Sequence, residues 1–115
     1  MSERSTGLLL QDILDAIESI LSYTKDISLD QYLVDLKTKH AVERNFSIIG
    51  EAVTRLGNDL KEQYHYINWR QVKDFRNIII HDYFGIDDTI VWDIIQFDLG
   101  QLEKDIKEVM KNVEG

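Results

Sequence analysis

Apolar side chains recur every three or four positions along almost the whole chain, the spacing that places them on one face of an α-helix. A first helix is predicted over residues 7–23, and Ser5 or Thr6 can cap its start because a hydroxyl accepts from a free amide of the first turn. The predicted inward stripe of this helix is Leu10, Ile13, Leu14, Ile17, Ile20 and Leu21.

The same spacing predicts a second, longer helix over residues 30–56, which Gly57 and Asn58 would end. Its expected inward stripe is Leu33, Leu36, Val42, Phe46, Ile49, Val53 and Leu56. A short helical piece over residues 59–64 is expected to follow it.

Two further long helices complete the pattern. One is predicted over residues 69–81 with Asn68 as its N-cap, and Val72, Phe75, Arg76, Ile79 and Ile80 would cover its buried side. The last is predicted over residues 88–113 with Asp87 as its cap, and its inward stripe would be Ile90, Ile94, Phe97, Leu102, Ile106, Val109 and Val113. No segment alternates long enough to predict a strand. We therefore expect one all-α domain over residues 1–115, a bundle of four long helices and one short one.

Composition narrows the class of protein. The chain has 115 residues and no Cys, which excludes disulfides and thiolate metal sites. No apolar run approaches the roughly 18 residues that span a bilayer, so we expect a cytoplasmic protein without a membrane segment. Acidic residues outnumber basic ones by 21 to 13, giving a net charge of −8. Such a charge opposes non-specific nucleic-acid binding, so any action on RNA needs a locally positive cleft.

One stretch carries an unusual set of polar residues on an apolar helix. Arg76, Asn77, His81 and Tyr83 surround three consecutive isoleucines, and they supply a fixed cation, an amide, a group titrating near neutrality and a phenol. These groups are suited to handling a phosphodiester. Arg76 and His81 lie about 140° apart on an ideal helix, so one regular helix would not aim both at one atom. Either the helix end unwinds, or two chains pair about a two-fold axis and line one cleft; we favour the pair.

Structural roles can also account for these residues. Arg76 can form a salt bridge with Glu51 or Asp74, and His81 can simply complement the C-terminal dipole of its helix. Tyr83 can be an aromatic that packs near the helix end with its hydroxyl in water. From the residues alone, both readings stay open.

The motif resembles the Arg-x4-His-x-Tyr signature of HEPN-domain proteins, specifically the HepT-like toxin branch. Arg76, His81 and Tyr83 match its spacing, and a polar residue after the arginine, here Asn77, also belongs to the pattern. Residues 42–53 (VERNFSIIGEAV) and 67–69 (INW) are similar to the same branch, so the resemblance covers nearly the whole chain.

The resemblance implies a HEPN bundle that forms a homodimer with the motif at its interface and cleaves RNA without a metal ion or other cofactor. In this family pattern Arg76 holds the phosphate, His81 is the general base or acid, and Asn77 supports them. Attack by the 2′-hydroxyl would leave a 2′,3′-cyclic phosphate. The lack of Cys and of a His-x3-His or carboxylate-rich cluster fits this metal-free route.

The resemblance also implies a partner. In HepT-like toxins the motif tyrosine, here Tyr83, receives AMP from a nucleotidyltransferase antitoxin of the MntA type, which blocks the cleft. HEPN domains also serve as non-catalytic binding modules that assist a nucleotidyltransferase. The net charge of −8 suits that alternative, in which Arg76 and His81 bind a nucleotide and RNA is not cut.

Overall fold

Every regular element of the described chain is helical. The computed structural model describes residues 4–81 and 88–113, with only the backbone over 78–81. In chain order the elements are α1 (Thr6–Thr24), α2 (Leu29–Val34), α3 (Leu36–Arg55), α4 (Asn58–Gln63), α5 (Trp69–His81), α6 (Asp88–Asp93), the π-helical turn η2 (Ile94–Asp98) and α7 (Leu99–Lys111). The predicted all-α class is confirmed, and pairing into a homodimer stays a prediction.

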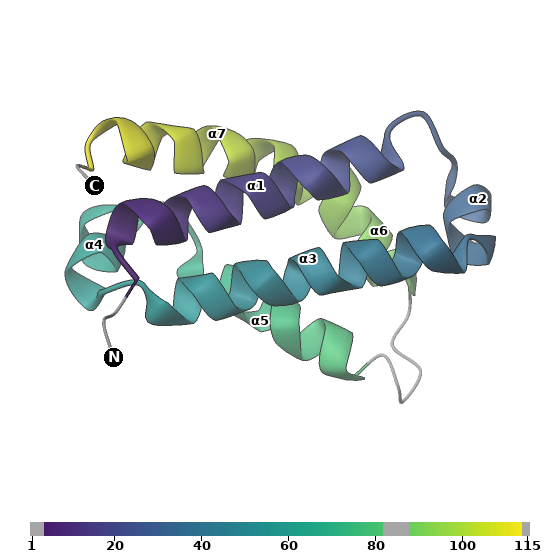
Figure 1. The fold of residues 1–115 in the computed structure, drawn as a ribbon, viewed down its shortest axis with the longest axis horizontal. Coiled ribbons are helices and arrows are strands. Elements are labelled where there is room, and N and C mark those ends of the chain that lie inside the picture. The colour runs from purple at the N-terminus through teal and green to yellow at the C-terminus, as the bar shows by residue number, and fades with distance from the viewer. Residues whose placement is uncertain (1–3, 82–87, 114–115) are drawn as a thin grey trace.

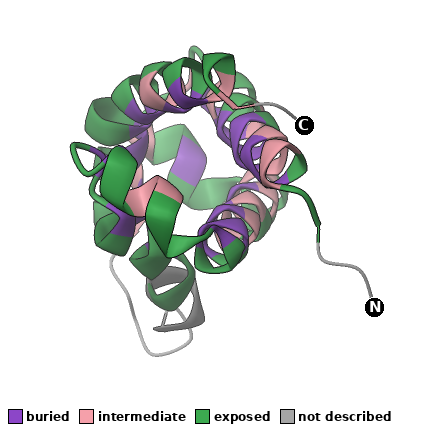
Figure 2. Ribbon diagram, turned by 90° about the vertical axis from the view of Figure 1, so that its left-hand side faces the viewer, coloured by how far each residue is buried: buried purple, intermediate pink, exposed green. Residues whose placement is uncertain are grey.

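Two long helices form the centre of the bundle. Helices α1 and α3 lie antiparallel along its long axis, α7 packs on α1, and α5 packs on α3 (Figure 1). The short helix α2 lies at one end of this pair and α4 at the other (Figure 1). Seen end-on, the helices turn their buried residues toward a common centre (Figure 2). The core is therefore shared by all the long helices, and α5 is attached to it mainly through α3.

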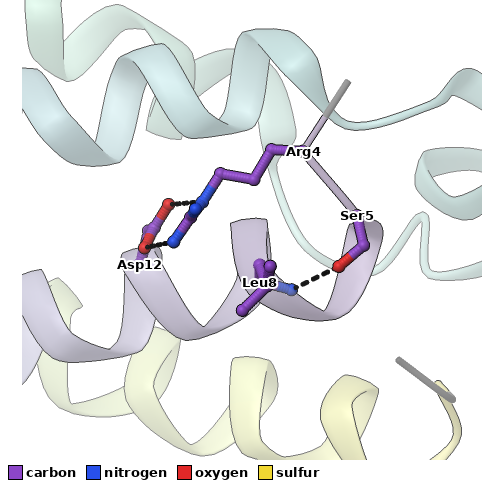
Figure 3. Close-up of polar contacts among 4 residues, drawn as sticks. All are labelled: Arg4, Ser5, Leu8 and Asp12. Atoms are coloured by element: carbon purple, nitrogen blue, oxygen red, sulfur yellow. Dashed lines mark hydrogen bonds and ion pairs between the residues drawn. The ribbon is translucent and has the colours of Figure 1, made fainter. Parts of the chain in front are cut away.

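The start of the first helix follows the sequence prediction. The Ser5 hydroxyl accepts a hydrogen bond from the Leu8 amide at 3.3 Å, and Arg4 donates to both carboxylate oxygens of Asp12 at 2.6 and 2.9 Å (Figure 3). The predicted inward stripe is buried apart from Leu21, which is half-buried. Capping and periodicity together account for this helix.

The second predicted helix is interrupted, which corrects the single span of residues 30–56. Asp35 leaves helical geometry with φ −98° and ψ 86°, ending α2 and capping α3. Its carboxylate accepts from the Thr38 amide at 3.1 Å and from the Thr38 hydroxyl at 2.6 Å. The break turns the chain, so Leu33 and Leu36, predicted inward, are exposed. Tyr32 is buried in their place.

The last predicted helix contains a π-helical turn that shifts its register. A π-turn adds one residue to a helical turn, so side chains beyond it are rotated relative to a regular helix. Phe97, predicted inward, lies within the turn and is exposed, and Ile90, predicted inward, precedes the turn in α6 and is exposed as well. Ile95 and Leu99 are buried instead, together with Leu102, Ile106 and Val109 as predicted. The predicted cap Asp87 lies outside the described residues.

No described helix combines the length and the apolar character that crossing a membrane requires.

Candidate functional site

The helix that carries the candidate residues begins as predicted. The Asn68 side-chain oxygen accepts from the Gln71 amide at 3.0 Å, which satisfies a free donor of the first turn of α5. The Trp69 indole donates to the Tyr64 carbonyl at 3.1 Å and fixes the preceding turn. Val72 and Phe75 are buried, and the Phe75 ring meets the α3 ring of Phe46 edge-on at 5.3 Å. Helix α5 is therefore anchored firmly along one face.

A glycine of α3 sets how closely α5 approaches. Gly50 is buried, and a Cβ added to it would lie 2.7 Å from the Arg76 Cβ, 3.0 Å from the Lys73 carbonyl oxygen and 3.1 Å from the Arg76 amide nitrogen. Only a residue without a side chain fits this crossing. The sequence interpretation missed this role of Gly50. The available signal was a glycine in the middle of a helical pattern that no turn explains.

The structure places Arg76 differently from its predicted position on the buried side of α5. Its Cβ faces Gly50, but the residue is exposed. Within the described chain, no ion pair joins Arg76 to Glu51 or Asp74. The structural salt bridge that the sequence left open is therefore absent among the described residues.

Asn77 lies next to Arg76 on the exposed side of the helix. Its amide nitrogen donates to the Asp74 carboxylate at 3.3 Å, one turn earlier on α5. This bond is long and solvent-exposed, so it restrains the amide weakly. Asn77 is therefore free to exchange Asp74 for another acceptor.

The other two candidates fall at or beyond the end of what is described. His81 is the last residue of α5, and its side chain lies outside the description. Tyr83 lies wholly outside the described residues. The structure thus shows Arg76 and Asn77 as consecutive, exposed residues of α5, and the positions of the imidazole and the phenol relative to them stay predictions.

The surroundings of Arg76 include further unpaired cations. Lys73 precedes Arg76 by three residues, so both lie on one face of α5. Partial burial and, secondarily, the Lys73 ammonium lower the pKa of Lys61 in α4, which places that lysine close to Lys73. Ion pairs hold Lys39, Lys107 and Lys111, whereas none is found for Lys61, Lys73 or Arg76 in the described chain. We call these three residues the α4–α5 cation row; in the sequence, Glu62 and Asp74 adjoin its two lysines.

Metal ligation has no candidate in the part of the chain that the structure describes. No three His, Asp or Glu side chains there are gathered closely enough to hold an ion.

Comparison with known proteins assigns the family. The model of the HepT-like ribonuclease family matches residues 13–109, which include α3, α5 and the whole Arg76-to-Tyr83 motif. This chain belongs to the HepT-like ribonuclease family. The resemblance inferred from the motif is confirmed.

Several HepT-like relatives extend over nearly the full chain. A protein of Thermococcus cleftensis named "Probable ribonuclease HepT" is 37% identical over 95% of this chain and 99% of its own. A protein of Methanocaldococcus jannaschii, whose name reads "Putative RNase", is 36% identical over the whole of this chain and 95% of its own. A protein of Caldanaerobacter subterraneus, whose name also reads "Putative RNase", is 32% identical over 89% of this chain and 91% of its own. No solved structure matches the chain significantly.

Proposed function

We propose that this HepT-like protein is a metal-independent endoribonuclease in which Arg76 and His81 act on the scissile phosphate. The observation that carries the proposal is Arg76 itself. The chain belongs to a ribonuclease family, and Arg76 is exposed and has no ion pair among the described residues. Helix α5, which carries it, is held in place by its buried side chains and by the close approach at Gly50. An exposed guanidinium with no ion pair to the described residues is suited to an external anion.

The chemistry follows from what the cleavage step demands. A base must remove the proton of the 2′-hydroxyl, which attacks the adjacent phosphorus, and an acid must protonate the departing 5′-oxygen. His81 would serve as base or acid, and Arg76 would donate to the two non-bridging phosphate oxygens as their charge grows. Asn77, weakly held by Asp74, would orient His81 or donate to a phosphate oxygen. No water enters this step, so the product is a 2′,3′-cyclic phosphate.

A homodimer would complete the site. An ideal helix separates Arg76 and His81 by about 140° around its axis, so residues of two chains offer a simpler cleft than one helix alone. Pairing would also double the α4–α5 cation row on one surface. That local charge is what RNA binding needs in a protein of net charge −8.

We further propose that the ribonuclease is the toxin of a toxin–antitoxin pair. The antitoxin would be an MntA-type nucleotidyltransferase that attaches AMP to the Tyr83 hydroxyl. Its physical effect would be to place a bulky anion two residues from His81, where it blocks the cleft and competes for the Arg76 guanidinium. Incubation with such an enzyme and ATP should add one AMP to the wild type but none to Tyr83→Phe, as measured by peptide mass spectrometry.

The proposed chemistry is tested by comparing RNA with DNA of the same sequence. Purified protein in excess EDTA should cut the RNA and leave cyclic-phosphate ends, and His81→Ala should lose this activity. The all-2′-deoxy oligonucleotide should remain intact, because it lacks the attacking hydroxyl. Cleavage of the deoxy substrate, or 5′-phosphate products, would contradict the mechanism.

The net charge of −8 favours one alternative, a non-catalytic module that partners a nucleotidyltransferase and holds a nucleotide with Arg76 and His81. Tight binding of AMP or ATP by unmodified protein, with no RNA turnover, would support this second function over the first.

A further inference from the structure

A groove borders α5 along Gln71, Val72 and Phe75. It runs between the turn that precedes α5 and the η2–α7 segment, and its volume is about 260 Å³. Val72 and Phe75 of α5 and Leu102 of α7 form its apolar lining. Arg76 follows Phe75 directly and is not among the described lining residues, so the groove borders the candidate site without including it.

Two exposed aromatic rings line this groove. Phe97 is 78% exposed and Tyr66 is 57% exposed, which is unusual for side chains of this size. The η2 turn causes the first exposure, because it rotates Phe97 out of the predicted inward stripe. The second ring is held in position by Tyr64, which it meets edge-on at 6.3 Å. Both rings therefore have structural reasons for their positions at the groove.

The polar lining of the groove is acidic. It contains the carboxylates of Asp98 and Asp105, and no Lys or Arg is found among its described lining residues. Desolvation and, secondarily, the carboxylates of Asp105 and Glu108 raise the pKa of Tyr66. Gln101 donates to Asp105 at 3.0 Å and restrains that carboxylate at the groove.

We propose that this groove binds an arginine side chain carried by a basic segment of a partner protein. Aromatic faces attract a guanidinium through their quadrupole, and carboxylates bind it in a bidentate manner. Arginine suits the groove better than lysine because its planar, weakly hydrated head stacks on rings. The same carboxylates repel the phosphates of RNA, so the groove is not an extension of the nucleic-acid surface.

The proposal does not depend on the ribonuclease assignment. A segment in the groove would contact α5 through Val72 and Phe75, and Arg76 is not among the described lining residues. The groove and the candidate site therefore consist of different residues, and a partner bound in the groove would lie beside the site.

The test is an NMR titration of ¹⁵N-labelled full-length protein with acetyl-Gly-Arg-Gly-amide. The matched probe is the peptide with citrulline in place of arginine, which keeps the shape and loses the charge. Amide shifts should be confined to Tyr66, Gln71, Phe97, Gln101 and their neighbours. The citrulline peptide should bind at least about threefold more weakly, in line with the modest strength of exposed cation–π and ion-pair contacts.

Variants separate the groove from the general acidity of the protein. Asp98→Asn with Asp105→Asn, and separately Phe97→Ala, should weaken binding of the arginine peptide about threefold to tenfold. Asp15→Asn with Asp30→Asn removes the same charge elsewhere and should leave affinity unchanged. Shifts spread over the acidic surface, equal binding of citrulline, or no shift at millimolar peptide would overturn the proposal. So would protein-concentration-dependent shifts of the groove without peptide, because a second copy would then be its occupant.

Discussion

At the scale of single residues, Gly50 controls the geometry of the candidate site. It carries no chemistry, but its missing side chain lets α5 cross α3 where the Arg76 stem leaves the helix. The backbone of Lys73 lies at the same crossing, so a larger residue cannot be accommodated by moving one flexible side-chain end. The position of Arg76 therefore depends on a residue of another helix.

Gly50→Ala should destabilise the protein, although the same change usually stabilises a helix. The new methyl group would meet atoms at 2.7 to 3.1 Å, so the helices must separate, at a cost of about 1–3 kcal/mol. Gly100→Ala is the matched control, because nothing lies within 4 Å of its added Cβ. That change should stabilise α7 by about 0.5–1 kcal/mol. Urea unfolding measures both, and a Gly50→Ala protein as stable as the wild type would contradict the close crossing.

Asp35 should make stability depend on pH at the α2–α3 break. Hydrogen bonds from the Thr38 hydroxyl and then the Thr38 amide lower the pKa of Asp35 below its ordinary 3.8. Because the pKa of Asp35 is lower in the folded state, the carboxylate contributes stability above pH 3.8. This stability is lost as the pH falls through the pKa of Asp35 in the folded protein.

Urea midpoints of the wild type and Asp35→Asn measure this effect. The wild type should be more stable at pH 7, and the difference should shrink at pH 3 or below. In a Thr38→Val background the difference at pH 7 should be smaller, because the hydroxyl donor at 2.6 Å is gone. A difference of equal size at both pH values would contradict the assigned role of the carboxylate.

At the scale of elements, the sequence predicts where helices form, but it does not predict where a helix is interrupted. Periodicity and caps at Ser5 and Asn68 predict α1 and α5 to within one residue at each end, because local hydrogen bonds determine both. The break at Asp35 and the turn η2 each interrupt an unbroken helical pattern. The break at Asp35 has a local signal, the cap on Thr38, which the sequence interpretation missed, whereas the π-turn has no side-chain cap that could announce it.

The η2 turn should behave as a one-residue insertion in a regular helix. Deleting the exposed Gln96 should convert it to α-helix while the buried stripes before and after it stay aligned. Deleting the exposed Lys104 from α7 should instead rotate Ile106 and Val109 by about 100°.

Both of those side chains are fully buried, so exposing them should cost about 1.5–3 kcal/mol each. Circular dichroism and urea unfolding should find the Gln96 deletion folded and the Lys104 deletion strongly destabilised. Equal loss of stability in both would contradict the insertion account.

At the scale of the whole molecule, charge distribution matters more than net charge. The protein carries −8 overall, yet Lys61, Lys73 and Arg76 have no ion pair in the described chain and lie along α4 and α5. The sequence identified Arg76 and Asn77 as candidates through their residue types and spacing. It did not reveal this cation row, because the neighbourhood of Lys61 and Lys73 arises from the packing of two helices.

The cation row should contribute to RNA binding. In a His81→Ala background, the double variant Lys61→Ala, Lys73→Ala should bind single-stranded RNA more weakly. The slope of log affinity against log salt concentration should become shallower by about 1.4, or about 0.7 for each lost contact. Lys25→Ala with Lys37→Ala removes equal charge elsewhere and should leave that slope unchanged. Fluorescence anisotropy at several salt concentrations measures the affinity and the slope of each double variant. Equal slopes for the two double variants would contradict a role of the cation row in RNA binding.

The most direct test of the account is the rate at which purified protein cleaves RNA in excess EDTA, with Arg76→Ala compared to Arg70→Ala. Both arginines are exposed on α5, so each variant should remain within about 0.5 kcal/mol of wild-type stability. We predict that Arg76→Ala loses roughly 100-fold or more in rate, whereas Arg70→Ala cleaves like the wild type. Equal rates for the two variants, or no cleavage by unmodified wild type, would contradict the claim that Arg76 serves a metal-independent ribonuclease.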